Sequence, residues 1–310
     1  MKDLSHLPTE GEGSHEGIPQ VEPTQIMTAK LAEHWMDKYK AAGRDDKPVA
    51  IEGTRLRGSW AGMCARRISY YLLGVEETDP PDIAGFWRME LGTITHDYYQ
   101  ALAQDFFDNA VLQVEAVAAF ANGNGSVHTD LLLLDPDTGK RIAVEIKTVG
   151  GYKHKASLGL VKTSDPPGPD PQHFLQGAVN ALAHDADGVV IVYLAQENVN
   201  KGWAADKEIH PSQKFSTEWA FEREEWEPFA KKEEARLKEI LRLAEEGTLA
   251  PRYVPISMPP GSRVVDPSTS SWEHTLDGEV VAVGSLWNGN FCDYCPFQAR
   301  CIQDLEDEQA

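Results

Sequence analysis

Two apolar runs joined by a polar turn constrain the fold of this chain more than any other feature. Residues 127–134 and 141–147 have the length of strands, and the six residues between them include a proline and a glycine. This pattern is typical of a β-hairpin. In the returning run Ile142, Val144 and Ile146 alternate with other residues, which predicts that they share one face of the hairpin.

The turn sets the register of this hairpin. We place Asp135 opposite Lys140. Asp130 then lies opposite Glu145, and Lys147 follows two residues later on the same face. Opposed side chains have Cβ atoms roughly 4.5–5.5 Å apart, and like charges at that spacing are destabilising. A magnesium ion would neutralise the two acids, because it prefers oxygen ligands and commonly takes one or two carboxylates. Two acids that hold a metal and one ammonium that orients water suit phosphodiester hydrolysis.

The same register places His128 opposite Lys147. Two considerations weigh against a functional interpretation. A Glu-x-Lys triplet is common in a chain in which 25% of the residues are charged, so a solvated strand face is the alternative. A slip of one residue would also put Asp130 and Glu145 on opposite faces. The hairpin therefore needs support from other parts of the chain.

The length and composition are those of a globular protein. At 310 residues, with 41% hydrophobic and 9% aromatic residues, the chain can bury a sizeable core in one large domain or two smaller ones. The first residues carry no apolar core of the kind that a secretory signal requires, and no apolar run is long enough to span a membrane. We expect a soluble, cytoplasmic protein without a membrane partner.

The net charge of −20 argues against a nucleic-acid partner, because Lys and Arg make the phosphate contacts. The distribution of charge weakens that argument. Much of the acid lies in segments that we expect to be solvated, including residues 222–246 and 304–308. Basic residues cluster at two places, Arg55, Arg57, Arg66 and Arg67, and Lys147, Lys153, Lys155 and Lys162. A local basic groove is therefore compatible with an acidic chain.

Periodicity and breaker residues predict a mixture of helices and strands. The predicted helices cover 24–42, 61–73, 83–107, 171–184 and 216–246, and further strands cover 111–120, 189–195 and a run ending near 210. We expect residues 1–22 to be disordered, 149–171 to form a long binding loop, and 247–290 to be irregular. Tyr152 to Lys155 mixes aromatic and basic residues, which suits single-stranded DNA, and a solvated loop is an equal alternative.

Four motifs follow one another along this order of elements: Gly92-x-x-x-His96, Asp130, Glu145-Ile146-Lys147 and Gln176. Together they resemble the motifs of the PD-(D/E)XK nuclease superfamily, specifically its RecB-like branch. The resemblance implies that magnesium or manganese is held by His96, Asp130, Glu145 and the Ile146 carbonyl. It also implies that Lys147 positions the attacking water and that Gln176 supports the site. Asn180 departs from the pattern, since this branch usually has Tyr there.

The chain has four cysteines, Cys64 and the C-terminal group Cys292-x-x-Cys295-x-x-x-x-x-Cys301. In an intracellular protein, close-spaced cysteines indicate a metal rather than disulfides. Four thiolates suit tetrahedral zinc or an iron-sulfur cluster, and spacing alone does not choose between them. This arrangement resembles the 4Fe-4S cluster of CRISPR-associated RecB-like exonucleases, which implies that the four cysteines bind such a cluster.

These expectations combine into one hypothesis. The fold class is α/β, with a restriction-endonuclease-like core of a central mixed sheet flanked by helices, an N-terminal helical region and a C-terminal iron-sulfur segment. A tail over 1–22 precedes a nuclease domain over 23–290, and 291–310 completes the cluster with Cys64. The resemblance implies a DNA exonuclease that prefers single-stranded ends, partnered by a helicase, recombinase or CRISPR integrase. The alternatives are an inactive DNA-binding or assembly subunit and a zinc-stapled protein unrelated to nucleases.

Overall fold

The structure is a computed structural model that divides into two compact units, Met1–Asp46 and Lys47–Ala310. It describes residues 34, 51–161, 167–197, 209–252, 263–266, 271–276, 279–285 and 295–309. The predicted tail over 1–22, nearly all of the predicted helix over 24–42, and Cys292 lie outside these residues. The fold described below is that of the second unit.

A six-stranded mixed sheet forms the centre of this unit. Its strands are β1 Leu56–Arg57, β2 Val111–Phe120, β3 Gly125–Leu134, β4 Arg141–Val149, β5 Gly188–Ala195 and β6 Ser216–Glu222. The order is β1-β3-β4-β5-β6, with β2 paired to β3. The β1/β3 and β4/β5 pairs are parallel and the other pairs are antiparallel. The predicted strand over 111–120 and the predicted hairpin are therefore confirmed.

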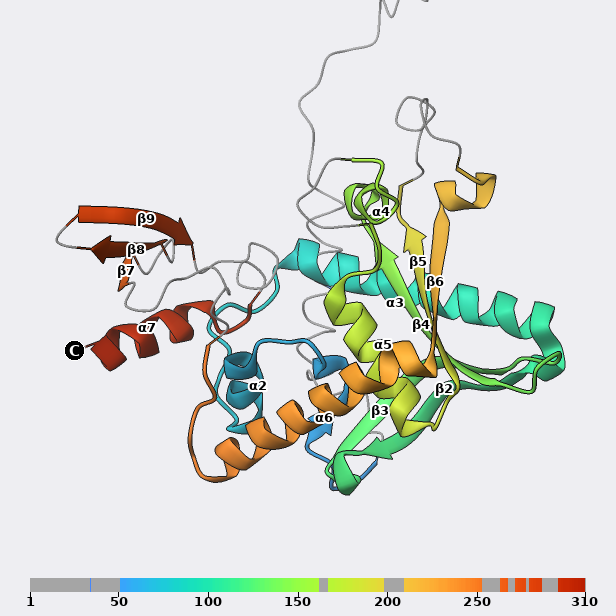
Figure 1. Ribbon diagram of the computed structural model, residues 1–310, viewed down its shortest axis with the longest axis horizontal. Helices are drawn as coiled ribbons and strands as arrows, with labels where there is room; N and C mark the ends of the chain where they lie inside the picture. The colour runs from blue at the N-terminus through green and yellow to red at the C-terminus, as the bar shows by residue number, and fades with distance from the viewer. Residues whose placement is uncertain are drawn as a thin grey trace, which may run out of the picture. The chain divides into compact units, whose positions relative to one another are not determined.

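Helices cover both faces of the sheet (Figure 1). On one face, α5 (Pro171–Ala183) and α6 (Arg223–Glu245) pack against buried side chains of β4 and β5. On the other face, α3 (Ile83–Phe107) contributes Ala103 to a cluster with the hairpin and β5. The predicted α/β fold, a central mixed sheet flanked by helices, is confirmed.

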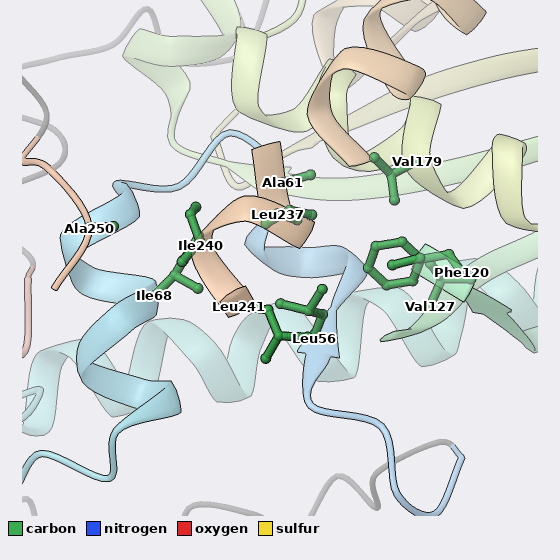
Figure 2. Packing of buried hydrophobic residues seen from close by; sticks show 11 residues of the cluster. Leu56, Ala61, Ile68, Phe120, Val127, Val179, Leu237, Ile240, Leu241 and Ala250 are labelled. Atoms are coloured by element: carbon green, nitrogen blue, oxygen red, sulfur yellow. The ribbon is translucent and has the colours of Figure 1, made fainter. Parts of the chain in front are cut away.

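A third apolar cluster joins the start of the unit to α6 (Figure 2). It includes side chains of α2 (Ala65–Leu72), β1, β3, α5 and α6, among them Leu56, Ile68, Val127, Val179, Leu237, Ile240 and Leu241. Burying a side chain of this size contributes roughly 1.5–3 kcal/mol. The cluster therefore fixes β1 and α2 against the helices that cover the hairpin.

Local signals explain where the helices that carry the site begin. The Asp82 carboxylate accepts a hydrogen bond from the Gly85 N–H at 2.7 Å and caps α3. Asp170 caps α5 in the same way, at 2.8 Å from the Gln172 N–H, and Pro171 occupies the first helical position. The predicted helix over 83–107 is confirmed, and the one predicted over 171–184 ends one residue earlier.

One predicted helix begins too early. Residues Ser216–Glu222 form β6, an antiparallel partner of β5, and α6 begins only at Arg223. The reason is an alternating pattern at the start of this charged stretch, in which Trp219 and Phe221 share one face. Trp219 packs on Tyr193 with ring centroids 5.0 Å apart, and Phe221 packs on Phe174 at 4.8 Å. The predicted strand ending near 210 falls mostly outside the described residues.

Two predicted irregular segments contain regular structure. The predicted loop over 149–171 holds α4 (Gly151–Ser157), and 247–290 holds an antiparallel sheet of β7 Arg263–Asp266, β8 Ser271–Leu276 and β9 Glu279–Ser285. The chain continues into α7 (Gln298–Gln309). Short 3-10 helices occur at η1 Gly58–Trp60, η2 Asp108–Ala110, η3 Ala121–Gly123 and η4 Pro211–Lys214. Within the described part of the chain, no helix has the length and apolar character needed to cross a membrane.

Candidate active site

The hairpin has the predicted register but opens at the acids. Backbone pairing runs from Leu134↔Arg141 to Leu131↔Val144 and ends there, so the predicted Asp130/Glu145 and His128/Lys147 pairs are not part of the ladder. Instead, the Ile146 N–H donates a hydrogen bond to the Asp130 carboxylate at 2.6 Å. The Asp130 side chain on β3 thus accepts a hydrogen bond from a backbone N–H of β4. The two strands separate next to Asp130.

Glu145 lies on β4 at this opening and is only 2% exposed. One carboxylate oxygen lies 2.6 Å from the Lys147 ammonium, and the other accepts a hydrogen bond from the Asn180 amide at 2.8 Å. Burial raises the pKa of Glu145 to about 7, because desolvation and the nearby Asp130 charge outweigh the opposing effect of Lys147. Glu145 and Asp130 are therefore close enough to repel each other.

Lys147 connects the acids to helix α5. Its ammonium donates a hydrogen bond to the Gln176 side-chain oxygen at 3.0 Å. Burial lowers the pKa of Lys147, but the charges of Glu145 and Asp130 and the bond to Glu145 outweigh burial, so the pKa is raised overall. Lys147 therefore stays protonated and can orient a water molecule or stabilise a developing negative charge, but it is not a base.

Helix α3 approaches Asp130 from the other side of the site. His96 Nδ1 lies 3.7 Å from the second Asp130 oxygen. One turn later, the buried Gln100 amide donates to the Asp130 backbone carbonyl at 3.2 Å and to the Glu115 carboxylate at 2.8 Å. The structure therefore brings together His96, Asp130, Glu145, Lys147 and Gln176, the side chains singled out from the sequence.

Sequence reasoning missed Gln100 and Glu115. Glu115 lies on β2 opposite Asp130, because its neighbours Val114 and Ala116 pair with Leu131 and Thr129. Its φ of +48° is unusual for a residue other than glycine. The only sequence signal for Gln100 is its position one helical turn after His96, and the backbone irregularity at Glu115 has no sequence signal.

The donor types at this opening suit a hard divalent cation. The Asp130 and Glu145 carboxylates are oxygen donors of the kind that magnesium and manganese prefer. Burial is the main cause of the raised pKa of Glu145 and the Asp130 charge adds to it, and a cation would relieve that repulsion between the two acids. In the described geometry both Glu145 oxygens contact protein groups, and no three His, Cys, Asp or Glu side chains of the described residues are arranged to hold a metal.

Three of the four cysteines come from distant parts of the chain to one region. Cys64 is the residue before α2, Cys301 lies on α7, and Cys295 precedes that helix. Burial raises the pKa of Cys295, and Cys64 and Cys301 add smaller effects in the same direction, so the three thiols lie within electrostatic reach. All three are free and partly buried. The donor type fits a thiophilic metal, and the fourth predicted ligand, Cys292, lies outside the described residues.

Ion pairs hold this cysteine region together. The Tyr70 hydroxyl donates to Asp304 at 2.7 Å, and Arg66 contacts Glu308 at 3.2 Å, so α7 is fixed against α2. The expectation that Asp304 is solvated is therefore wrong, as is the expectation that Arg66 belongs to a surface basic cluster. Both side chains are buried, and they form an ion pair with each other at 3.8 Å.

The predicted DNA-binding segment over 152–155 is only partly exposed. His154 is fully buried on α4 and contacts the Gln213 backbone carbonyl at 2.8 Å, and burial lowers its pKa. Lys153 pairs with Asp170 at 2.7 Å. Tyr152 alone in this segment presents a large exposed aromatic side chain. The segment therefore anchors α4 to its neighbours, and neither the predicted single-stranded DNA surface nor the solvated loop describes all four of its residues.

No protein-family profile and no curated protein sequence matches the chain. Among solved structures, it is similar to the protein SSO0001, with 17% identity over 89% of this chain and 96% of that chain and a TM-score of 0.44. It is also similar to an alkaline exonuclease from Laribacter hongkongensis, with 14% identity over 63% of this chain and 89% of that chain and a TM-score of 0.42. A phage-related exonuclease from Haemophilus somnus 129PT shares 10% identity over 59% of this chain and 82% of that chain, with a TM-score of 0.37.

Proposed function

We propose that this chain is a metal-dependent deoxyribonuclease of the PD-(D/E)XK type. One observation carries the proposal, namely that Asp130, Glu145 and Lys147 meet where β3 and β4 part. Two acids and a protonated lysine are the groups that phosphodiester hydrolysis requires. The contact between Lys147 and Gln176 and the approach of His96 to Asp130 support it further.

Each residue has a distinct role in this proposal. Asp130, Glu145, His96 and the Ile146 carbonyl hold magnesium or manganese, which when bound polarises the phosphate and activates water. The Lys147 ammonium orients the attacking water and stabilises the charge that develops on the phosphate. Gln176 holds that ammonium through its side-chain oxygen. Action as an exonuclease on single-stranded ends, and a helicase, recombinase or CRISPR integrase as partner, follow from the sequence resemblance.

A DNA cleavage assay that compares variants of the buried Lys147–Glu145 pair with a variant of the exposed Lys140 tests this function. We expect Lys147→Ala and Glu145→Ala to lower the rate at which labelled single-stranded DNA is degraded in magnesium or manganese by about 100-fold or more, as for loss of one electrostatic catalytic group. Lys140→Ala is the matched control, because Lys140 pairs with Glu222 at the surface near the turn of the same hairpin. Folded Glu145→Ala and Lys147→Ala proteins that cut as fast as the parent would contradict the proposal.

We also propose that Cys64, Cys292, Cys295 and Cys301 bind a 4Fe-4S cluster. The nearness of three of these thiols, from both ends of the described unit, supports the proposal. The cluster would act as a structural staple, since metal binding that closes a long loop stabilises the folded state. Protein purified without oxygen should be brown and contain about four irons per chain. A colourless protein with one zinc per chain would contradict the cluster and support the zinc alternative.

A second candidate function is a DNA-binding or assembly subunit without catalysis. The observation that favours it is that both Glu145 oxygens are engaged by Lys147 and Asn180. Such a subunit would bind DNA equally well with magnesium and with a chelator, and it would cut none. A binding assay run beside the cleavage assay separates the two functions.

A further inference from the structure

We infer that Asn180 is a positioning residue that bridges the gap between β3 and β4 and fixes the Glu145 carboxylate for metal binding. The inference rests on the proposed function, because it assigns a purpose to the geometry of a metal ligand. It concerns the residue that stands where RecB-like nucleases usually have Tyr.

Strand β3 has a gap in its pairing next to Asp130. Along one edge β3 pairs with β2. Along the other edge its first residues pair with β1, at Gly125 and Ser126, and its last residues pair with β4, from Leu131 onward. No strand of the described residues pairs with residues 127–130 on that edge. Buried backbone groups need hydrogen-bond partners, so another group must donate hydrogen bonds to the carbonyls in this gap.

The Asn180 amide donates a hydrogen bond to one of these carbonyls and another to the Glu145 carboxylate. Its nitrogen donates to the His128 backbone carbonyl at 3.1 Å and to the Glu145 carboxylate at 2.8 Å. Both partners are acceptors, which requires the NH₂ side of the amide to face them. One side chain of α5 therefore connects the two strands where their own ladder has ended.

Asparagine at position 180 costs the folded state free energy, and packing alone does not explain why it is there. Asn180 is 1% exposed, and its side-chain oxygen has no hydrogen-bond partner among the residues that the structure describes. An unsatisfied buried oxygen costs about 1–3 kcal/mol, so an apolar residue of the same size would avoid that cost. The benefit of asparagine here is its NH₂ group, which an apolar side chain lacks.

Gly58 leaves room for this amide. A Cβ atom at position 58 would lie 2.8 Å from the Asn180 oxygen and 2.7 Å from a Val127 methyl group. Real Cβ contacts are essentially never this short, so any larger residue would push on Asn180 or Val127. Substitution of Gly58 therefore disturbs the contacts of the Asn180 side chain while residue 180 remains asparagine.

The consequence concerns the Glu145 carboxylate. Lys147 holds one oxygen and Asn180 holds the other, so the plane of the carboxylate is fixed with respect to Asp130. Groups that orient a metal ligand commonly change metal affinity by 10- to 100-fold when removed, roughly the range seen in other metal sites. The Gln100 amide makes a related double contact on the other side of β3, but to the Asp130 backbone and not to its carboxylate. Loss of the Gln100 amide should therefore change the metal affinity less than loss of the Asn180 amide.

The test measures manganese binding by the full chain without DNA, from the EPR signal of free Mn²⁺. We expect Asn180→Leu to raise the Kd for Mn²⁺ by about 10- to 100-fold. Gly58→Ala and Gln100→Leu should raise it by smaller factors, and the KM for a DNA oligonucleotide at saturating Mn²⁺ should stay within about twofold. Gln172→Leu is the control, since it makes a similar amide-to-alkyl change on the same helix two turns earlier.

Folding of each variant is checked by circular dichroism. If Asn180→Leu does not fold, Asn180→Ser replaces it, because serine is small and polar but too short to reach Glu145. An unchanged Mn²⁺ affinity in a folded Asn180 variant, with a parent that binds Mn²⁺ and cuts DNA, would overturn the positioning role alone. A parent that binds Mn²⁺ no better than Glu145→Ala would overturn the proposed function, and the positioning role with it.

Discussion

The two halves of one hairpin behave differently. Near the turn, apolar residues of β3 face β4 and the backbone ladder is closed from Leu131↔Val144 to Leu134↔Arg141. Farther from the turn, Asp130 faces Glu145 and the ladder is open, with side chains making the contacts that backbone groups would make. The comparison teaches that two strands can supply rigidity at one end and a reactive site at the other.

Two ion pairs show the same contrast. Lys140 contacts Glu222 at 2.7 Å in the closed half, where the side chains are 45% and 62% exposed. Lys147 contacts Glu145 at 2.6 Å in the open half, where the side chains are 22% and 2% exposed. The distances are alike, so any difference in energy arises from burial.

The largest expected effect comes from breaking the buried pair. Lys147→Met should lower the free energy of unfolding by about 3–5 kcal/mol at pH 8, because it leaves Glu145 buried without its cation. The loss should shrink at pH 6, because Glu145 takes up a proton there in both proteins: its pKa is raised to about 7 in the parent, and loss of Lys147 raises it further. Urea unfolding at the two pH values measures this. An equal loss at both would show that Glu145 does not change protonation.

The next effect tests the closed half. Leu131 is buried in the cluster between the hairpin and α3, so Leu131→Ala should cost about 2–5 kcal/mol in urea unfolding. Leu134→Ala, at the exposed end of the same strand, should cost under about 1 kcal/mol. Similar losses for the two variants would show that the closed half is not the rigid end.

A smaller effect concerns pH and a histidine beside the open half. The Tyr193 hydroxyl accepts a hydrogen bond from the Asp170 N–H and donates one to His173 Nδ1, each at 2.7 Å. Burial lowers the pKa of His173 to about 3, and Lys147 and Lys153 add to the shift. The unfolded chain therefore binds a proton near pH 6.5 and the folded chain does not, so stability falls as pH drops below 6.5.

His173→Gln should remove this dependence. Between pH 7 and 5.5 the parent should lose about 1 kcal/mol more than the variant does. His154 is also held neutral and stays in both proteins, so it contributes equally to each. Identical stability profiles for parent and variant would show that His173 titrates normally in the fold.

The smallest effect is expected at the exposed pair. Lys140→Ala should change the free energy of unfolding less than any variant above, and the difference should shrink further in 1 M salt. Unfolding curves at low and high salt measure it. A loss comparable to that of Lys147→Met would mean that burial does not distinguish the two pairs.

Local patterns were sufficient for much of the fold. The helix over 83–107, the strand over 111–120 and the hairpin register follow from periodicity and turn residues, which act over a few neighbours. The strand over 216–222 was missed because its alternation runs directly into a charged helix. Its pairing with β5 decides the structure, and that contact is distant in sequence.

The site shows a similar limit. Acids on opposed strands can be paired from the sequence, but the opening of the ladder beside Asp130 cannot, because it depends on β1 occupying the same edge of β3. The contact of Asn180 with Glu145 depends on that gap. Glu115 requires the irregular backbone of β2 to face the site. These features arise from tertiary packing.

The most direct test of the central claim is a crystal structure of the full chain soaked with manganese, with data collected to show its anomalous signal. We predict a peak at coordinating distance from both the Asp130 and Glu145 carboxylates, with the β3–β4 ladder still open beside them. A map without manganese there, or a ladder that is closed through Asp130 and Glu145, would contradict it.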